Sequence, residues 1–336
     1  MSERLSARCS RAIRGMVAAA AALCAVAAAC GGAVAQSYPN QGIKIIIPFG
    51  AGGAVDLVGR PFAQKLSDII GQSVVIENRA GAGSLIGVMA AAKAAPDGYT
   101  LLMTTGSMVT TPLVNPNAGY DPIRDLMPVT QLVYSQGTIL ATRPDFPASD
   151  LSGLIALVKK SPNKYSYAHT GVGTPPYVAP ELFRRYAGLE LVPVPYKGTG
   201  NVLTDVIASQ VDMTFSGIPS VVDFARNGQV KALASTGTKR TAVLPDVPTF
   251  QELGYADMDI RGYYGLWFPA GTPPELIKFI HSAALKALED PDLKRLYEKG
   301  ALEIIGSSPQ EFGAFVAKDF ERQKGIVKML GLGPKP

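Results

Sequence analysis

The sequence predicts an α/β fold with two lobes. A near-continuous apolar run, Ile43 to Ile47, ends at Pro48 and a glycine-rich turn, which is typical of a strand buried on both faces of a parallel sheet. Strand-like and helix-like segments alternate after it, and this alternation resumes from about residue 129. Such alternation predicts open sheets with right-handed crossovers, and the chain holds enough segments for two of them.

The first part of the chain supplies three strands and two helices. Residues 54–70 have helical spacing, with Val55, Phe62 and Leu66 among the apolar positions on one side, and Gly71 ends the segment. Pro61 lies within this helix, where we expect a kink. The other expected segments are strands at 74–76 and 99–103, a glycine-rich turn at 80–83, and an alanine-rich helix from that turn to about residue 93.

The middle of the chain repeats the alternation. Its expected strands are 129–133, 138–142, 165–168, 192–195, 212–215 and 231–235, and its expected helices are 151–160, 180–186 and 200–209. Tyr263 to Phe268 then predicts a buried strand that returns the chain to the first lobe, in preference to an aromatic platform for a ligand.

The last quarter is helical and carries capping signals. Thr272 precedes Glu275 by three positions, and Ser308 precedes Glu311 in the same way, with proline at the first helical position. This is the capping-box pattern. Asp290, before a proline, indicates a further helix start.

The first 35 residues have the parts of an export signal. Four arginines precede an alanine-rich apolar run, which ends near Cys30 and is followed by small residues at 33–35. A run of roughly 15 residues is shorter than the roughly 20 needed to span a bilayer. We therefore expect cleavage after Ala35, with lipidation of Cys30 as the alternative. All three cysteines lie in this segment, so the mature chain would have no disulfide, cysteine nucleophile or thiolate metal site.

The charge of the chain is concentrated in that signal. It carries four of the 32 Lys and Arg and one of the 27 Asp and Glu, which leaves 28 and 26, so the net charge falls from +5 to +2. No polybasic stripe remains to indicate a nucleic-acid partner, and no later apolar stretch is long enough to cross a membrane.

Two glycine-rich loops are candidate anion sites. The first, Phe49 to Gly53, lies between a buried strand and a helix start, where backbone N–H groups and the positive end of a helix dipole converge. A dinucleotide fingerprint is absent, because Val55 stands where glycine is required. The second, Thr170 to Thr174, has the same character in the other lobe. The two loops are expected to hold one small anion across a cleft; the alternative is two tight turns without a ligand.

Catalytic and metal-binding patterns are weak. The mature chain has two histidines, His169 and His281, and neither lies in a pattern that provides a nucleophile and an orienting carboxylate. His281 is expected at the surface, whereas His169 precedes the second loop and could line the cleft. A single histidine does not make a metal site, so we expect no metal, no cofactor and no enzymatic activity.

Six stretches resemble the Bug-type receptors of tripartite tricarboxylate transporters, in that family's order and spacing. They are PFGAGGAVD (48–56), VVIENRAGAGSLIG (74–87), APDGYTLL (95–102), VPYKGTG (194–200), LPDVPTFQE (244–252) and FPAGTPPE (268–275). The resemblance implies a type II periplasmic-binding (Venus flytrap) fold, with two lobes joined by crossing strands. It also implies that the two loops hold a carboxylate through backbone N–H groups and water.

Three positions depart from the family's pattern. Pro176 stands where many members have histidine, Leu85 where they often have asparagine, and Ser216-Gly217 where Asp-Asn is common. These changes remove polar groups from or near the expected cleft, which argues against transferring a particular amino-acid or citrate ligand.

We therefore expect a periplasmic, monomeric receptor that binds a small carboxylate and delivers it to a membrane transporter. A receptor that presents its ligand to a sensor kinase, and an exported carboxylate-processing enzyme, are the alternatives. The expected lobes are 36–137 with 262–336, and 138–261. The expected ligand-binding residues are Phe49, Gly50, Ala51, Gly52, Gly53, Asp56, Thr170, Gly171, Val172, Gly173 and Thr174, with Arg79, Ser107, His169, Tyr196 and Ser216 as further candidates. We assign Asp56 to orienting the first loop and treat Arg79 as the rival anchor for the anion.

Overall fold

The computed structural model describes residues 38–196 and 200–333. The chain divides into two units at Asn40/Gln41, and the description below concerns the unit that begins at Gln41. The expected export signal, its cleavage after Ala35 and the lipidation of Cys30 lie outside the described residues.

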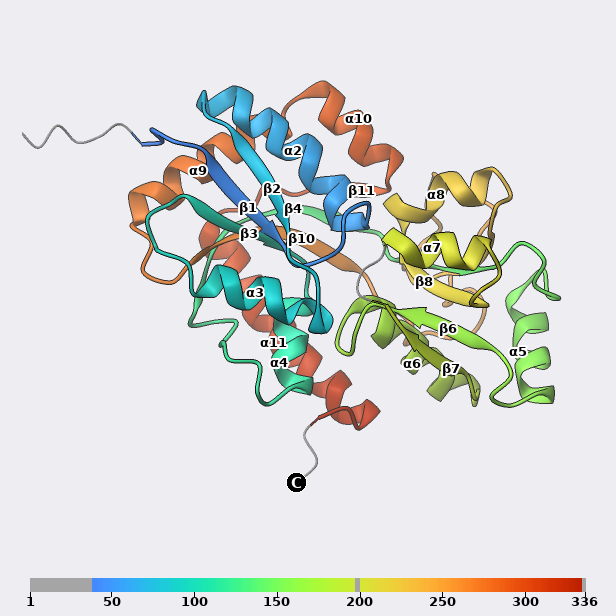
Figure 1. Cartoon of the computed structure of the whole chain (residues 1–336). Coiled ribbons are helices and arrows are strands. Elements are labelled where there is room, and N and C mark those ends of the chain that lie inside the picture. Colours follow the sequence, from blue (N-terminus) through green and yellow to red (C-terminus); the bar gives the residue numbers. More distant parts are fainter. Residues whose placement is uncertain (1–37, 197–199, 334–336) are drawn as a thin grey trace, which may run out of the picture. The chain divides into compact units, whose positions relative to one another are not determined.

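The first sheet has six strands within the described residues, in the order β11-β4-β10-β3-β1-β2 (Figure 1). Its strands are β1 (Ile43–Ile47), β2 (Val74–Asn78), β3 (Thr100–Thr104), β4 (Leu126–Ser135), β10 (Gly262–Pro269) and β11 (Leu302–Ile304). The apolar run predicted as a buried strand is β1, which pairs in parallel with both β2 and β3. β10 pairs antiparallel with β3 and β4, so a late segment of the chain lies in the centre of the first sheet.

Helices cover both faces of this sheet (Figure 1). One face carries α2 (Ala54–Ile70), α9 (Pro274–Leu288) and α10 (Pro291–Lys299), and the other carries η1 (Ala82–Ser84), α3 (Leu85–Ala92), α4 (Ser107–Val114) and α11 (Pro309–Leu330). α2 has the predicted bounds and continues through Pro61. Trp267 of β10 is buried against Phe312 of α11, which confirms the predicted buried strand.

The second sheet has five strands in the described chain, in the order β7-β6-β8-β5-β9. Its elements are β5 (Thr138–Thr142), α5 (Leu151–Lys160), β6 (Ser166–His169), α6 (Pro175–Ala187), β7 (Val192–Pro195), α7 (Gly200–Ile207), β8 (Met213–Gly217), α8 (Ile218–Arg226) and β9 (Lys231–Ser235). Leu140 of β5 belongs to the core cluster formed with α5 and α6, whereas its neighbours Ile139 and Ala141 belong to the cluster formed with α7 and α8. Successive strand side chains point to opposite faces, so both faces of this sheet are buried.

Several local predictions differ from the structure. α6 begins at Pro175 rather than near residue 180, and α4 and α8 were not predicted. The capping box at Thr272 is wrong: α9 begins one residue later, and the Thr272 hydroxyl donates to the Pro269 carbonyl, 2.8 Å away, within the preceding turn. The capping box at Ser308 and the cap at Asp290 are confirmed.

The two sheets are connected where β4 leads into β5 and where the chain returns from β9 to β10. Thr236 joins these connections: its hydroxyl accepts the N–H of Thr138 at 2.9 Å and donates to the carbonyl of Ile260 at 2.7 Å. The expected lobe boundaries, at 137/138 and 261/262, fall in the same connections. We propose this place as the hinge between the lobes.

Candidate functional site

A cavity of about 70 Å³ lies between the two lobes. Three of its lining residues, Phe49, Thr170 and Ser216, were candidates from the sequence. The other lining residues are Ala54, Val55, Thr105, Ser135, Gly137, Thr138, Pro175, Pro176, Gly217, Ser220, Ile260, Gly262 and Tyr264. Both sheets therefore contribute to one cavity, at the carboxyl ends of β3 and β8, where open α/β sheets bind ligands.

The starts of α2 and α8 meet at this cavity. A Cβ at Gly217 would lie 3.1 Å from the Cβ of Ala54, so the two helix starts are in contact across the lobe boundary. Both helices have glycine at the N-cap, Gly53 and Gly217, and neither has a side-chain cap; α8 has Pro219 at its second position, so the free N–H groups of its first turn are those of Ile218 and Ser220. The first N–H groups of a helix have no partner within the helix, and two positive dipole ends favour an anion here.

The second glycine-rich loop is arranged differently from the first. α6 begins with Pro175 and Pro176, which have no N–H, and the next N–H, that of Tyr177, donates to the Thr174 carbonyl at 2.9 Å. The Thr174 hydroxyl donates to the Gly171 carbonyl at 2.7 Å. This helix start therefore presents ring carbons to the cavity in place of donors.

Asp56 holds the first loop and does not line the cavity. Its carboxylate accepts hydrogen bonds from the Gly52 N–H at 2.9 Å, from Arg60 at 2.8 Å and from Asn78 at 2.9 Å. Asn78 also donates to the Phe49 carbonyl. Burial raises the pKa of Asp56, but the hydrogen bonds from Arg60, Gly52 and Asn78 outweigh it, so the pKa lies below its ordinary value.

Other candidates from the first lobe do not line the cavity either. Ala51 and Gly52 are exposed to solvent. Arg79 forms an ion pair with Glu77, which also pairs with Lys44 at 2.8 Å. The hydrogen bonds from Lys44 and Arg79 lower the pKa of Glu77.

Further candidates from the second lobe serve its internal structure. His169 is buried, and its Nδ1 accepts the Gly171 N–H at 3.1 Å. Burial lowers the pKa of this imidazole. The Tyr196 hydroxyl donates to Asp205 at 2.8 Å. Val172 is exposed to solvent. The residues that line the cavity do not include His169, Gly171, Val172 or Tyr196.

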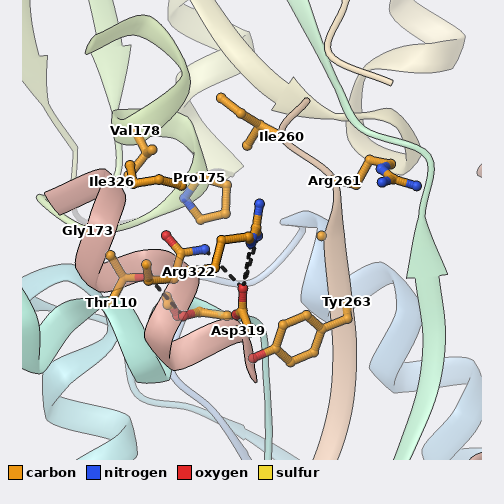
Figure 2. Close-up of a pocket in the computed structure, with 14 residues that line it drawn as sticks. Thr110, Gly173, Pro175, Val178, Ile260, Arg261, Tyr263, Asp319, Arg322 and Ile326 are labelled. Carbon is orange, nitrogen blue, oxygen red and sulfur yellow. Dashed lines mark hydrogen bonds and ion pairs between the residues drawn. The ribbon is translucent and has the colours of Figure 1, made fainter. Parts of the chain in front are cut away.

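A second cavity of about 30 Å³ adjoins the first and shares Pro175, Ile260 and Gly262 with it (Figure 2). Ser107 and Gly173, both candidates from the sequence, line this second cavity. The remaining polar lining comes largely from α11 and β10. Figure 2 shows Arg322 paired with Asp319, at 2.9 Å, with the Tyr263 hydroxyl directed toward the same carboxylate.

The two cavities differ in charge. None of the described residues that line the first cavity is charged. The described lining of the second cavity includes two arginines, and each is paired: Arg261 with Asp259 at 2.6 Å, and Arg322 with Asp319. The Oδ2 atom of Asp319 and the hydroxyl of Tyr263 are buried without a hydrogen-bond partner among the described residues. Burial and the charge of Asp319 raise the pKa of Tyr263.

Sequence reasoning missed most of the lining, although one signal was available. Thr105 follows β3 directly and Gly217 ends β8, so the residues at strand ends would have identified both. Among residues 38–196 and 200–333, no group of three or more His, Cys, Asp or Glu side chains could hold a metal ion.

The helices of the described chain include none with the length and apolar character of a membrane span.

A family model described as the tripartite tricarboxylate transporter family receptor matches residues 58–332. The chain is 33% identical over 303 residues to protein BugT of Bordetella pertussis. The matched region covers 88% of this chain and 91% of BugT. Its structure resembles periplasmic binding protein BugD, with 30% sequence identity and a TM-score of 0.86. That match covers 89% of this chain and 100% of BugD. It also resembles MatC from Rhodopseudomonas palustris with bound malate, with 29% sequence identity and a TM-score of 0.83. That match covers 86% of this chain and 100% of MatC. The predicted two-lobe periplasmic-binding fold is confirmed.

Proposed function

The chain belongs to the tripartite tricarboxylate transporter family of receptors, and from this membership we propose that it captures a small organic carboxylate between its lobes and delivers it to a transporter of that type. The resemblance to Bug-type receptors is confirmed. The prediction of a binding protein rather than an enzyme is also confirmed, because the family and its structural neighbours are binding proteins.

The observation that carries the proposal is the meeting of two uncapped helix starts at the cavity. α2 comes from the first lobe and α8 from the second, and their first residues are in contact through Ala54 and Gly217. A carboxylate placed beside them would accept hydrogen bonds from both lobes. Hydrogen bonds to a charged group are each worth roughly 1.5 to 3 kcal/mol, so such an anion would favour the closed arrangement of the lobes.

Family membership and the malate bound to MatC support the ligand class. The periplasmic binding proteins to which the chain is similar, together with the export signal read from residues 1–35, support a periplasmic location. We include this location and the transporter partner in the proposal.

Binding of a carboxylate is tested directly on the purified protein. Native mass spectrometry identifies any ligand that co-purifies, and a thermal-shift screen with a broad carboxylate panel tests the class. A ligand that binds only the folded state stabilises it by about 2.7 kcal/mol at a hundredfold excess over Kd. We expect carboxylates to raise the melting temperature while neutral sugars do not. The reverse pattern would contradict the proposal.

A further inference from the structure

We propose that the ligand is a monocarboxylate with an uncharged, largely apolar body, and that its one carboxylate is bound at the start of α8 beside Ser216 and Ser220. This inference rests on the proposed function and names the substrate class of the same cavity. It differs from the dicarboxylate bound by MatC, malate.

The described residues that line the cavity are uncharged, and the surface they present is mainly apolar. Phe49 and Val55 contribute from the first loop and α2, and Ile260 from the chain connection that returns to β10. Pro175 and Pro176 provide ring carbons at a helix start that would otherwise offer N–H donors. An apolar body gains by leaving water for such a surface, whereas a second carboxylate would lose its hydration without a charged partner.

The hydroxyl groups of the lining show where donors remain. Four of them already donate within the protein: Thr105 to Ser107, Ser135 to the Gly137 carbonyl, Thr138 to Thr236, and Thr170 to Thr174. The Thr236 hydroxyl donates to Ile260, so in its contact with Thr138 it accepts. These four hydroxyl protons are therefore not available to a ligand.

Within the described lining, the remaining hydroxyls are those of Ser216, Ser220 and Tyr264, and all three lie beside Gly217. Ser216 is 4% exposed and lines the cavity at the end of β8. The Oγ of Ser220 is buried without a partner within the described residues. A Cβ at Gly217 would lie 3.5 Å from the Tyr264 hydroxyl. Donors are thus concentrated at one place, which also holds the starts of α2 and α8.

The nearest arginines are not available for a second carboxylate. Arg322 and Arg261 line the adjoining cavity. Arg322 is paired with Asp319, which is also on α11, and Arg261 is paired with Asp259, two residues before it in the chain. Withdrawing Arg322 toward a ligand would leave Asp319, a buried carboxylate, without that partner. The Arg322 side chain is half exposed, but the Asp319 side chain is only 4% exposed, and a buried carboxylate that loses a charged partner is destabilised. The structure therefore disfavours a dicarboxylate that extends toward α11.

Matched pairs of acids test the inference by isothermal titration calorimetry. Hexanoate is compared with adipate, and benzoate with terephthalate, because each pair differs by one added carboxylate. We expect the monoacid to bind at least tenfold more tightly in every pair that binds. Equal or tighter binding of the diacids, or binding confined to polar acids such as malate, would overturn the inference while leaving the proposed function intact. No binding by any acid of a broad panel would instead overturn the proposed function, and this inference with it.

Two serine variants locate the carboxylate. Ser220→Ala should weaken binding of the preferred monoacid by roughly tenfold, because it removes one donor to a charged group. Ser152→Ala, at an exposed position on α5, is the matched control and should not change Kd. Circular dichroism establishes that both variants fold. Unchanged affinity in folded Ser220→Ala would remove the carboxylate from the start of α8.

Discussion

Gly83 of the first lobe and Gly171 of the second lie directly against each other. A Cβ at Gly171 would be 2.6 Å from the Cα of Gly83, and a Cβ at Gly83 would be 2.8 Å from the carbonyl oxygen of Val172. Cβ atoms do not approach backbone atoms this closely, so the lobes can make this contact only with glycine at both positions.

Gly83→Ala is therefore expected to hold the lobes apart. Gly83 has φ of +63°, and Gly188, with φ of +62° and nothing within 4 Å of its Cβ position, is the matched control. Both variants should lose about 1 kcal/mol of stability through the positive φ. Only Gly83→Ala should weaken ligand binding and enlarge the ligand-bound radius of gyration in small-angle scattering. The same affinity and radius in both variants would show that the contact is not needed for closure.

Asp56→Asn should loosen the first loop. The variant loses the charge that accepts hydrogen bonds from Gly52, Arg60 and Asn78, and we expect a loss of about 2 kcal/mol in the free energy of unfolding. Asp68→Asn, at an exposed position on the same helix, should change it little. Urea denaturation measures both, and equal stability of the two variants would contradict the role assigned to Asp56.

The contribution of Asp56 to the free energy of unfolding should also depend on pH in a defined direction. Its pKa in the folded state lies below 3.8, the ordinary value. The stabilisation is therefore fully present above the unfolded-state value and is lost as the pH falls through the lower, folded-state value. The difference between wild type and Asp56→Asn should be constant near neutral pH and should shrink below about pH 4. A difference that grew on acidification would have the wrong sign.

Thr236→Val tests the hydroxyl that joins the two connections between the lobes. The variant leaves the N–H of Thr138 and the carbonyl of Ile260 without their partner, which should cost about 1 to 3 kcal/mol of stability. Thr142→Val is the control, because the Thr142 hydroxyl is equally buried but has no partner among the described residues. That change should be neutral or stabilising. Denaturation curves that coincide for the two variants would exclude the proposed bridge.

Arg79→Gln should leave ligand binding nearly unchanged. Arg79 is paired with Glu77 and does not line the cavity. Calorimetry on the folded variant decides this point, with Ser220→Ala as the comparison. If Arg79→Gln lost binding and Ser220→Ala did not, the carboxylate would be bound by an ion pair with Arg79 rather than by the helix starts.

The sequence by itself determined the elements whose pattern is local. The helices at 54–70 and 151–160 and the strand at 43–47 have the predicted bounds, because hydrophobic periodicity and Gly71 act within a few residues of the chain. The motifs also determined the family, and with it the two-lobe fold. The short helices α4 and α8 were missed, because each contains a proline and several β-branched residues, which disfavour a helix locally.

Tertiary structure alone decided which residues face the cavity. Ala54 and Gly217 are in contact although 163 positions separate them in the chain, and no local pattern reports such a pair. The loop residues Gly52 and Thr174 were expected to hold the ligand, but their polar groups bond to Asp56 and Gly171. Ser220 and Tyr264 gave no signal in the sequence, because a hydroxyl becomes a binding group only when folding buries it beside a cavity without another partner.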